Sequence, residues 1–130
     1  MATIIQAKRY VYDLLKDVDV EGGVYIDKRP SIDEDIVVNA ITTDSNFWQS
    51  TIINVNCYVP DLEIKHEGRE ITVPNIARLE EIAEDVYDIV KSNSMSQKFR
   101  LYTESMQQLE EIEERSHYIN FRIRIFVKNK

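Results

Sequence analysis

Residues 118–127 read Tyr-Ile-Asn-Phe-Arg-Ile-Arg-Ile-Phe-Val, and they are the most informative segment of the chain. Successive side chains of a β-strand point to opposite faces, so the stretch divides into two sets. One set is entirely apolar: Ile119, Phe121, Ile123, Ile125 and Val127. The other set mixes polar and aromatic residues: Tyr118, Asn120, Arg122, Arg124 and Phe126. The first set predicts a face that packs on a core, and the second is typical of a contact surface.

Two amphipathic helices are predicted upstream of this strand. The first covers about residues 3–16, with Thr3 as its N-cap, and its apolar positions recur at three- and four-residue steps. The second helix follows Pro74, which suits a first-turn position. Its apolar stripe consists of Ile76, Leu79, Ile82, Ala83, Val86, Ile89 and Val90. Because each helix has one apolar stripe, each is expected to cover a face of the sheet.

Strands are predicted over residues 24–26, 36–42, 51–59 and 99–106. The segment 62–73 is predicted to be an exposed excursion, with a small hairpin that pairs 63–65 with 70–72. Residues 107–114 are ambiguous, because their glutamates favour helix whereas pairing with the final strand would make them extended.

The order of the elements is therefore α-β-β-β-α-β-β. The three consecutive strands are expected to be antiparallel neighbours, since parallel pairing requires a long crossover. With 130 residues, the chain has the length of one domain. The sequence thus predicts a single α+β domain, with an antiparallel or mixed sheet of about five strands and two helices packed on it.

Composition restricts the classes of function. The formal net charge of −7 argues against sequence-specific or general nucleic-acid binding, which depends on lysine and arginine neutralising phosphates. The longest uncharged stretch, residues 45–60, is too polar to cross a membrane. The first residues lack the pattern of a signal peptide, and Cys57 is the only cysteine, so a reducing cytosolic compartment is expected.

Candidate catalytic residues are few, and no catalytic, cofactor or metal site is predicted. His66 and His117 lack the spacing of metal ligands. Cys57 lies on the apolar face of its strand and is interpreted as a small buried hydrophobe. The acidic run 33–35 is interpreted as a solvated turn, and Gly22-Gly23 as a turn. An enzyme would need His117, Ser116 and nearby acids to converge in one pocket.

Two groups of residues near the C-terminus are candidates for a subunit interface. The first lies on one face of the final strand: Tyr118, Arg122, Arg124 and Phe126. The second is the acidic segment upstream: Glu110, Glu111, Glu113 and Glu114. The acids and arginines could pair across a hairpin within the chain, or one set could face a neighbouring subunit. Trp48 is a further candidate, either as a core or edge-covering residue or as an interaction anchor.

The pattern resembles the tail-completion, or tail-terminator and head–tail joining, proteins of long-tailed bacteriophages and prophages. The resemblance covers nearly the whole chain and rests on the order of five segments: YVYDLL (10–15), DKRP (27–30), IVVNAI (36–41), IINVNCYV (52–59) and FRIRIF (121–126), with the acidic second helix between the last two. Residues 62–73 form a longer segment than the family pattern requires.

The resemblance implies a non-enzymatic structural protein that forms a ring, usually hexameric, and contacts tail-tube and head-connector proteins. Such a protein would assemble in the bacterial cytoplasm and become part of the virion. An acidic ring would suit the passage of DNA, because a lumen that attracted phosphate would stall it. The alternative is a cytosolic protein-binding adaptor domain, monomeric or dimeric, that uses the same exposed aromatic residues.

Overall fold

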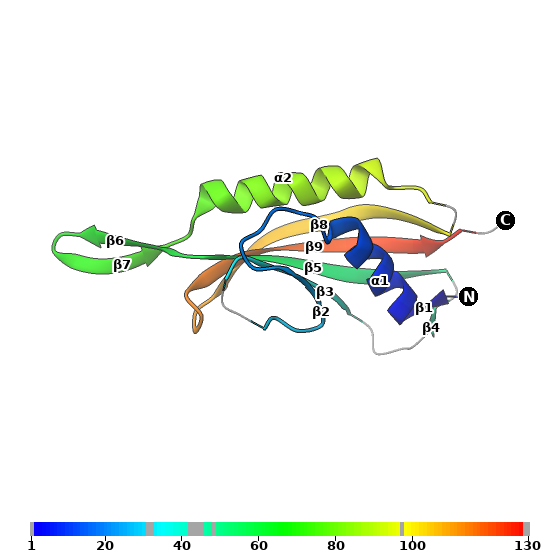
Figure 1. Cartoon of the computed structure of the whole chain (residues 1–130), viewed down its shortest axis with the longest axis horizontal. Helices are drawn as coiled ribbons and strands as arrows, with labels where there is room; N and C mark the ends of the chain where they lie inside the picture. The colour runs from blue at the N-terminus through cyan, green and yellow to red at the C-terminus, as the bar shows by residue number, and fades with distance from the viewer. Residues whose placement is uncertain (1, 31–32, 42–45, 48, 97, 129–130) are drawn as a thin grey trace.

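The computed structural model describes residues 2–30, 33–41, 46–47, 49–96 and 98–128. A mixed five-stranded sheet forms the body, two helices pack on one of its faces, and a two-stranded hairpin projects from one end (Figure 1). The α+β class and the mixed sheet with two helices are as predicted.

The sheet has the order β2-β3-β5-β9-β8. Its strands span Val24–Ile26 (β2), Asp35–Ala40 (β3), Ser50–Pro60 (β5), Ser116–Val127 (β9) and Phe99–Glu111 (β8). The pairs β3–β5, β5–β9 and β9–β8 are antiparallel. A short pair of strands, β1 (Ala2–Thr3) and β4 (Asn46–Phe47), lies apart from this sheet and is too short to be recognised from periodicity.

The pairing of β2 with β3 is parallel, so the prediction of three antiparallel neighbours was wrong at this pair. β2 has only three residues. The linker 27–34 therefore has to travel back only about 10 Å, which does not require a long crossover. Asp27, whose φ is 68°, begins this return.

Both helices lie on the same face of the sheet and share one hydrophobic core (Figure 1). The first helix, α1 (Ile4–Leu15), begins with the predicted Thr3 cap, and Gln6 completes a capping box. The second helix, α2 (Ile76–Ser92), is capped by Asn75, so Pro74 precedes the cap and does not occupy the first turn. Most of the predicted α2 stripe is buried, but Ile76 is 44% exposed because it lies at the start of the helix.

The apolar face of β9 is the centre of the core, as the sequence predicts. Phe121, Ile123 and Ile125 are completely buried, and Ile119 and Val127 are partly buried. Cys57, on β5, is also completely buried, and burial raises the pKa of its thiol. The interpretation of this cysteine as a buried hydrophobe is thus confirmed.

Strand β8 is longer than predicted and contains an irregularity. Pairing with β9 makes residues 107–111 extended, which resolves the ambiguity of that segment. The register shifts between Thr103 and Ser105, so that Thr103 is opposite Ile123 and Met106 is opposite Phe121. One extra residue in a bulge reverses the alternation of the faces. Met106 therefore lies on the face covered by the helices.

The predicted hairpin is present as β6 (Leu62–His66) and β7 (Arg69–Val73). Glu67 and Gly68 join the strands, with φ values of 51° and 79°, as a two-residue type I′ turn requires. The hairpin extends past the end of the sheet, away from α2 (Figure 1).

Candidate subunit interface

The predicted contact residues of β9 lie on the sheet face away from the helices, here called the outer face. Tyr118, Arg122, Arg124 and Phe126 alternate with the core residues of the same strand. Neighbouring positions on this face carry asparagines that bond to one another. The Asn54 amide donates to Asn39 (3.1 Å), and the Asn120 amide donates to Asn56 (2.6 Å). The middle of the outer face is therefore a polar surface that satisfies its own hydrogen bonds.

Aromatic pairs lie at the two ends of the outer face. Tyr58 and Tyr118 pack with ring centroids 4.7 Å apart, and the Arg29 guanidinium lies 4.1 Å from the Tyr58 ring. Burial raises the pKa of Tyr58. At the other end, Tyr102 stacks on Phe126 with centroids 5.9 Å apart. The aromatic side chains predicted for contact thus have partners within the chain, although Tyr102 remains 48% exposed.

The arginines of the outer face differ in availability to a partner. Arg124 donates from Nε to Glu104 (3.0 Å) and from Nη1 to the Ser50 hydroxyl (3.1 Å). Arg122 is exposed, and within the described part of the chain it has no ion pair. The same is true of Arg100, on β8, so that within the described residues Arg122 and Arg100 are the arginines of this face that are available to a partner.

The acidic segment does not pair with these arginines. The β8–β9 register places Glu110 opposite His117 and Glu111 opposite Ser116, whereas Glu113 and Glu114 lie in the turn that follows β8. Arg124 is instead opposite Tyr102, and Arg122 is opposite Ser105. Of the four glutamates, Glu114 forms an ion pair with Arg29, and Glu110 lies 3.6 Å from the His117 ring. The hairpin is present, but its register separates the two charge sets. Trp48 lies outside the described residues.

His117 lies between two carboxylates, an arrangement that the sequence did not reveal. Its Nδ1 is 2.6 Å from the Asp61 carboxylate, and Glu110 faces Nε2. Asp61 lies between β5 and β6, at the base of the projecting hairpin. Ser116, the adjacent residue, points to the other face of β9 and is completely buried. Ser116 and His117 therefore do not converge, and His117 is placed to hold the base of the hairpin.

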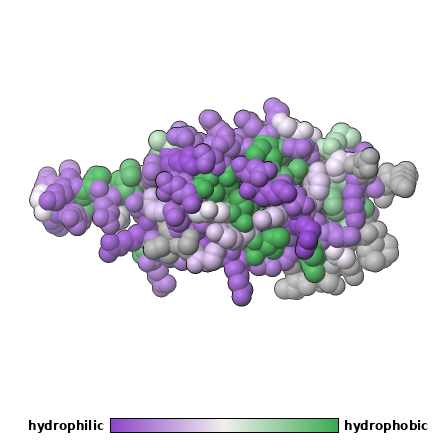
Figure 2. All heavy atoms as spheres, in the orientation of Figure 1, coloured by the Kyte–Doolittle hydropathy of each residue, from purple (hydrophilic) through white to green (hydrophobic). Residues whose placement is uncertain are grey.

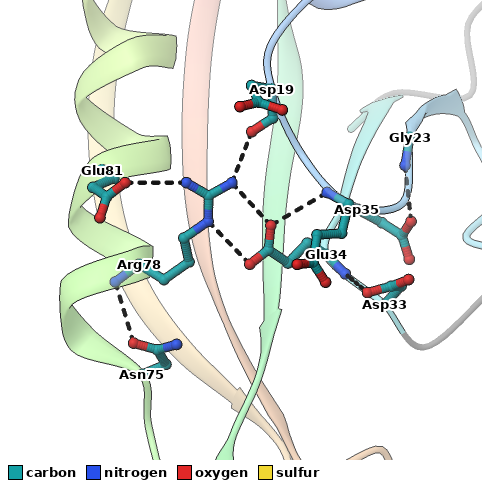
Figure 3. A network of polar contacts seen from close by, with 9 residues as sticks. Asp19, Gly23, Asp33, Glu34, Asp35, Asn75, Arg78 and Glu81 are labelled. Carbon is teal, nitrogen blue, oxygen red and sulfur yellow. Dashed lines mark hydrogen bonds and ion pairs between the residues drawn. The ribbon is translucent and has the colours of Figure 1, made fainter.

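Two of the three residues of the acidic run 33–35 are buried and only Asp33 is exposed, which corrects the interpretation of the run as a solvated turn. Glu34 is 8% exposed and Asp35 is completely buried. The Arg78 guanidinium binds both oxygens of Glu34, at 3.0 and 2.9 Å, and donates to the Asp19 carbonyl and to Glu81 (Figure 3). The hydrogen bonds to Glu34 are the main cause that raises the pKa of Arg78. Because Arg78 belongs to the first turn of α2, this network ties that helix to β3 and to the preceding loop.

A second arginine binds the same, N-terminal end of β3. Arg29 donates from Nε to Asp35 (3.1 Å) and also forms the ion pair with Glu114 in the β8–β9 turn. Its side chain is only 8% exposed. Glu34 lies 44 positions from Arg78, and Glu114 lies 85 positions from Arg29, so no local pattern indicated these two pairs.

The hairpin β6–β7 has one aliphatic face and one charged face. Directly opposite residues share a face. The pairs Leu62–Val73 and Ile64–Ile71 form the aliphatic face, and the charged face consists of Glu63, Lys65, Glu70 and Thr72. Leu62, Ile64 and Ile71 are 46, 42 and 40% exposed. Figure 2 shows hydrophobic side chains along this arm, which lies beyond the body. An isolated two-stranded ribbon is at best marginally stable in water, so this face favours a covering partner.

The fold and this surface define a small α+β domain with a projecting, partly apolar arm. No protein-family model matches the sequence, and no curated protein matches it either. Among the described residues, neither helix has the length and apolar character that a membrane crossing requires. The same part of the chain contains no cluster of histidine, cysteine and acidic side chains suited to a metal ion.

Proposed function

We propose that this protein is a non-enzymatic structural subunit of a phage or prophage particle, which forms a ring at the tail end or the head–tail junction through contacts between identical subunits. The projecting hairpin carries the proposal. A closed ring of identical subunits requires two different patches on each subunit, one for each neighbour. An arm at one end of an elongated body provides one patch that is distinct from the rest of the surface.

The order of the segments and the charge are consistent with this role. The elements follow the sequence pattern on which the resemblance to tail-completion proteins rests. The net charge of −7 suits a ring through which DNA passes, because phosphate would not be held at its inner surface. The partners in such a particle are other copies of the chain, the tail tube and the head connector, and a hexamer is the expected ring.

An adaptor domain is the second candidate, and the same arm favours it. An aliphatic strand pair can bind a groove on an unrelated protein as well as a groove on another copy. The two candidates differ in the symmetry of the complex, because the adaptor would form a complex of unlike chains or a two-fold dimer.

Mass and symmetry measurements test the proposal. The purified protein, alone and mixed with isolated tail tubes, should form closed rings of one subunit type, which native mass spectrometry would count and electron microscopy would show. Only monomers or two-fold dimers under both conditions would contradict the proposed function. Genes for capsid, portal and tail-tube proteins beside this one would support it.

Charge reversal on the outer face provides a mutational test. Arg122→Glu should prevent ring formation and leave the monomer folded, because Arg122 is exposed and makes no ion pair within the described chain that the change could break. Arg124→Glu is a poorer test, since it also removes the bond to Glu104. Arg9→Glu, on the exposed side of α1, makes the same change of charge and should leave assembly intact. Normal rings from the Arg122 variant would remove the outer face from the interface.

A further inference from the structure

A hollow with an apolar floor lies between α2 and β8. β8 is the outer strand of the sheet, so one side of this groove is open. The cavity measures about 520 Å³; its apolar floor is Ala83, Tyr87 and Met106, and its rim is Glu80, Glu84 and Asp88. Tyr87 and Met106 are 41 and 48% exposed. A smaller cavity of about 180 Å³ continues along the same two elements past Tyr87 to Val90 and Thr103.

The floor of the groove depends on the bulge in β8. Without the register shift after Thr103, Met106 would fall on the outer face, with Arg100 and Tyr102. The shift turns the Met106 side chain toward α2. The result is an unbranched, adaptable apolar side chain in an open groove, a feature typical of surfaces that receive a partner.

The aliphatic face of the hairpin and this groove are complementary in charge. At the tip of the hairpin, this face ends with His66 and Arg69, which are directly opposite each other and share the face of Ile64 and Ile71. The face is therefore apolar along its length and cationic at its end. The groove has the complementary arrangement, an apolar floor with three acids at its rim. Within the described residues, neither Arg69 nor the three rim acids form an ion pair.

The hairpin and the groove also have similar lengths. A five-residue strand extends about 17 Å, and the helix from Glu80 to Asp88 rises about 12 Å. The aliphatic pairs can thus lie along the floor while the tip reaches the acidic rim.

We propose that the aliphatic face of the β6–β7 hairpin of one copy occupies the α2–β8 groove of a neighbouring copy, with Arg69 against Glu80, Glu84 and Asp88. This inference rests on the proposed function, to which it adds a pair of contact surfaces besides the outer face that Arg122→Glu tests. The hairpin cannot reach its own groove, because it points away from the body at the end where α2 begins (Figure 1). An arm that binds a different surface on the next copy makes a head-to-tail contact, which closes into a ring when the rotation allows.

Substitutions in the hairpin test the first surface. Ile64→Thr with Ile71→Thr keeps β-branched residues but removes the apolar contact, and should raise the self-association Kd by roughly a hundredfold or more. The matched control is Lys65→Thr with Glu70→Thr. This is the adjacent cross-strand pair on the charged face, and its loss leaves the net charge unchanged. Circular dichroism should show that both variants remain folded, and analytical ultracentrifugation should show association lost only in the first.

A charge swap tests whether the two surfaces meet. Arg69→Glu and Glu84→Lys should each weaken association by roughly tenfold, and the two changes together in one chain should restore it, because the pair is re-formed with reversed signs. Asp85→Lys is the matched control, since Asp85 is the exposed neighbour of Glu84 but does not line the groove. It should neither weaken wild-type association nor rescue Arg69→Glu.

Mixing two defective variants tests the head-to-tail geometry. A groove variant, Tyr87→Lys with Met106→Lys, retains its hairpin, and the isoleucine variant retains its groove. Each alone should be monomeric, whereas an equal mixture should form a one-to-one dimer that grows no further. Rings that persist in the isoleucine and groove variants, or a swap that gives no rescue, would overturn this inference and leave the proposed ring intact. A wild-type chain that stays monomeric even at millimolar concentration and with tail tubes would overturn both.

Discussion

Replacing Arg78 with alanine should lower the free energy of unfolding by about 3 kcal/mol, because a carboxylate that is buried against it would lose its cation. Glu34 is 8% exposed and binds the Arg78 guanidinium through both oxygens. Of the hydrogen bonds to this carboxylate that the structure shows, only that from the Glu21 amide, at 3.3 Å, would remain. In a chain of this size the melting temperature should fall by roughly 10 °C.

The matched control is Glu81→Ala. Glu81 binds the same guanidinium, but its side chain is 66% exposed, so its loss should change stability by less than about 0.5 kcal/mol. A double variant, Glu34→Leu with Arg78→Met, should recover part of the stability, since it removes both charges together. Chemical denaturation of the four proteins gives the required free energies. Equal effects of Arg78→Ala and Glu81→Ala would contradict the assignment of Glu34 as the critical partner.

Truncation of Phe121 to alanine should lower the free energy of unfolding by about 3–5 kcal/mol. Phe121 is completely buried at the centre of the core, where the helices and the sheet meet. The cost combines the lost apolar contact with the cavity that remains after incomplete relaxation.

Phe126→Ala removes the same number of atoms from the opposite face of the same strand. Its ring is only partly buried and stacks on Tyr102, so the expected loss is about 1 kcal/mol. The comparison, made by urea unfolding, measures directly how different the two faces of β9 are. Similar losses from the two variants would show that the outer face is packed as tightly as the core.

Much of the fold was predictable from local periodicity. The alternation in β9 identified its core face, and the helical stripes identified α1 and α2, because side-chain direction follows from backbone geometry over a few residues. The hairpin β6–β7 was predicted for the same reason. The parallel pairing of β2 and β3 was not, because a three-residue strand allows a short return that the usual crossover length does not anticipate.

The candidate interface was predictable only in part. The positions of Arg122, Arg124 and Phe126 on one face follow from alternation and agree with the structure. The partners of the charges do not follow from it. The pairing of β8 with β9 places Tyr102 opposite Arg124, so that Glu104, rather than the glutamates of residues 110–114, binds this arginine. The register shift after Thr103 placed Met106 beside α2 and so completed the groove.

Periodicity in the sequence thus specified the buried face of the regular segments, except in β8 beyond its bulge, since that information is contained in each segment alone. The tertiary structure decided which charged side chains form ion pairs and which remain available to a binding partner. Glu34 meets Arg78 across 44 positions of the sequence, and Arg29 meets Glu114 across 85. Such pairs form because a buried charge without a partner is energetically costly. The packing of segments that are distant in the sequence determines which opposite charge lies close enough to pair with it.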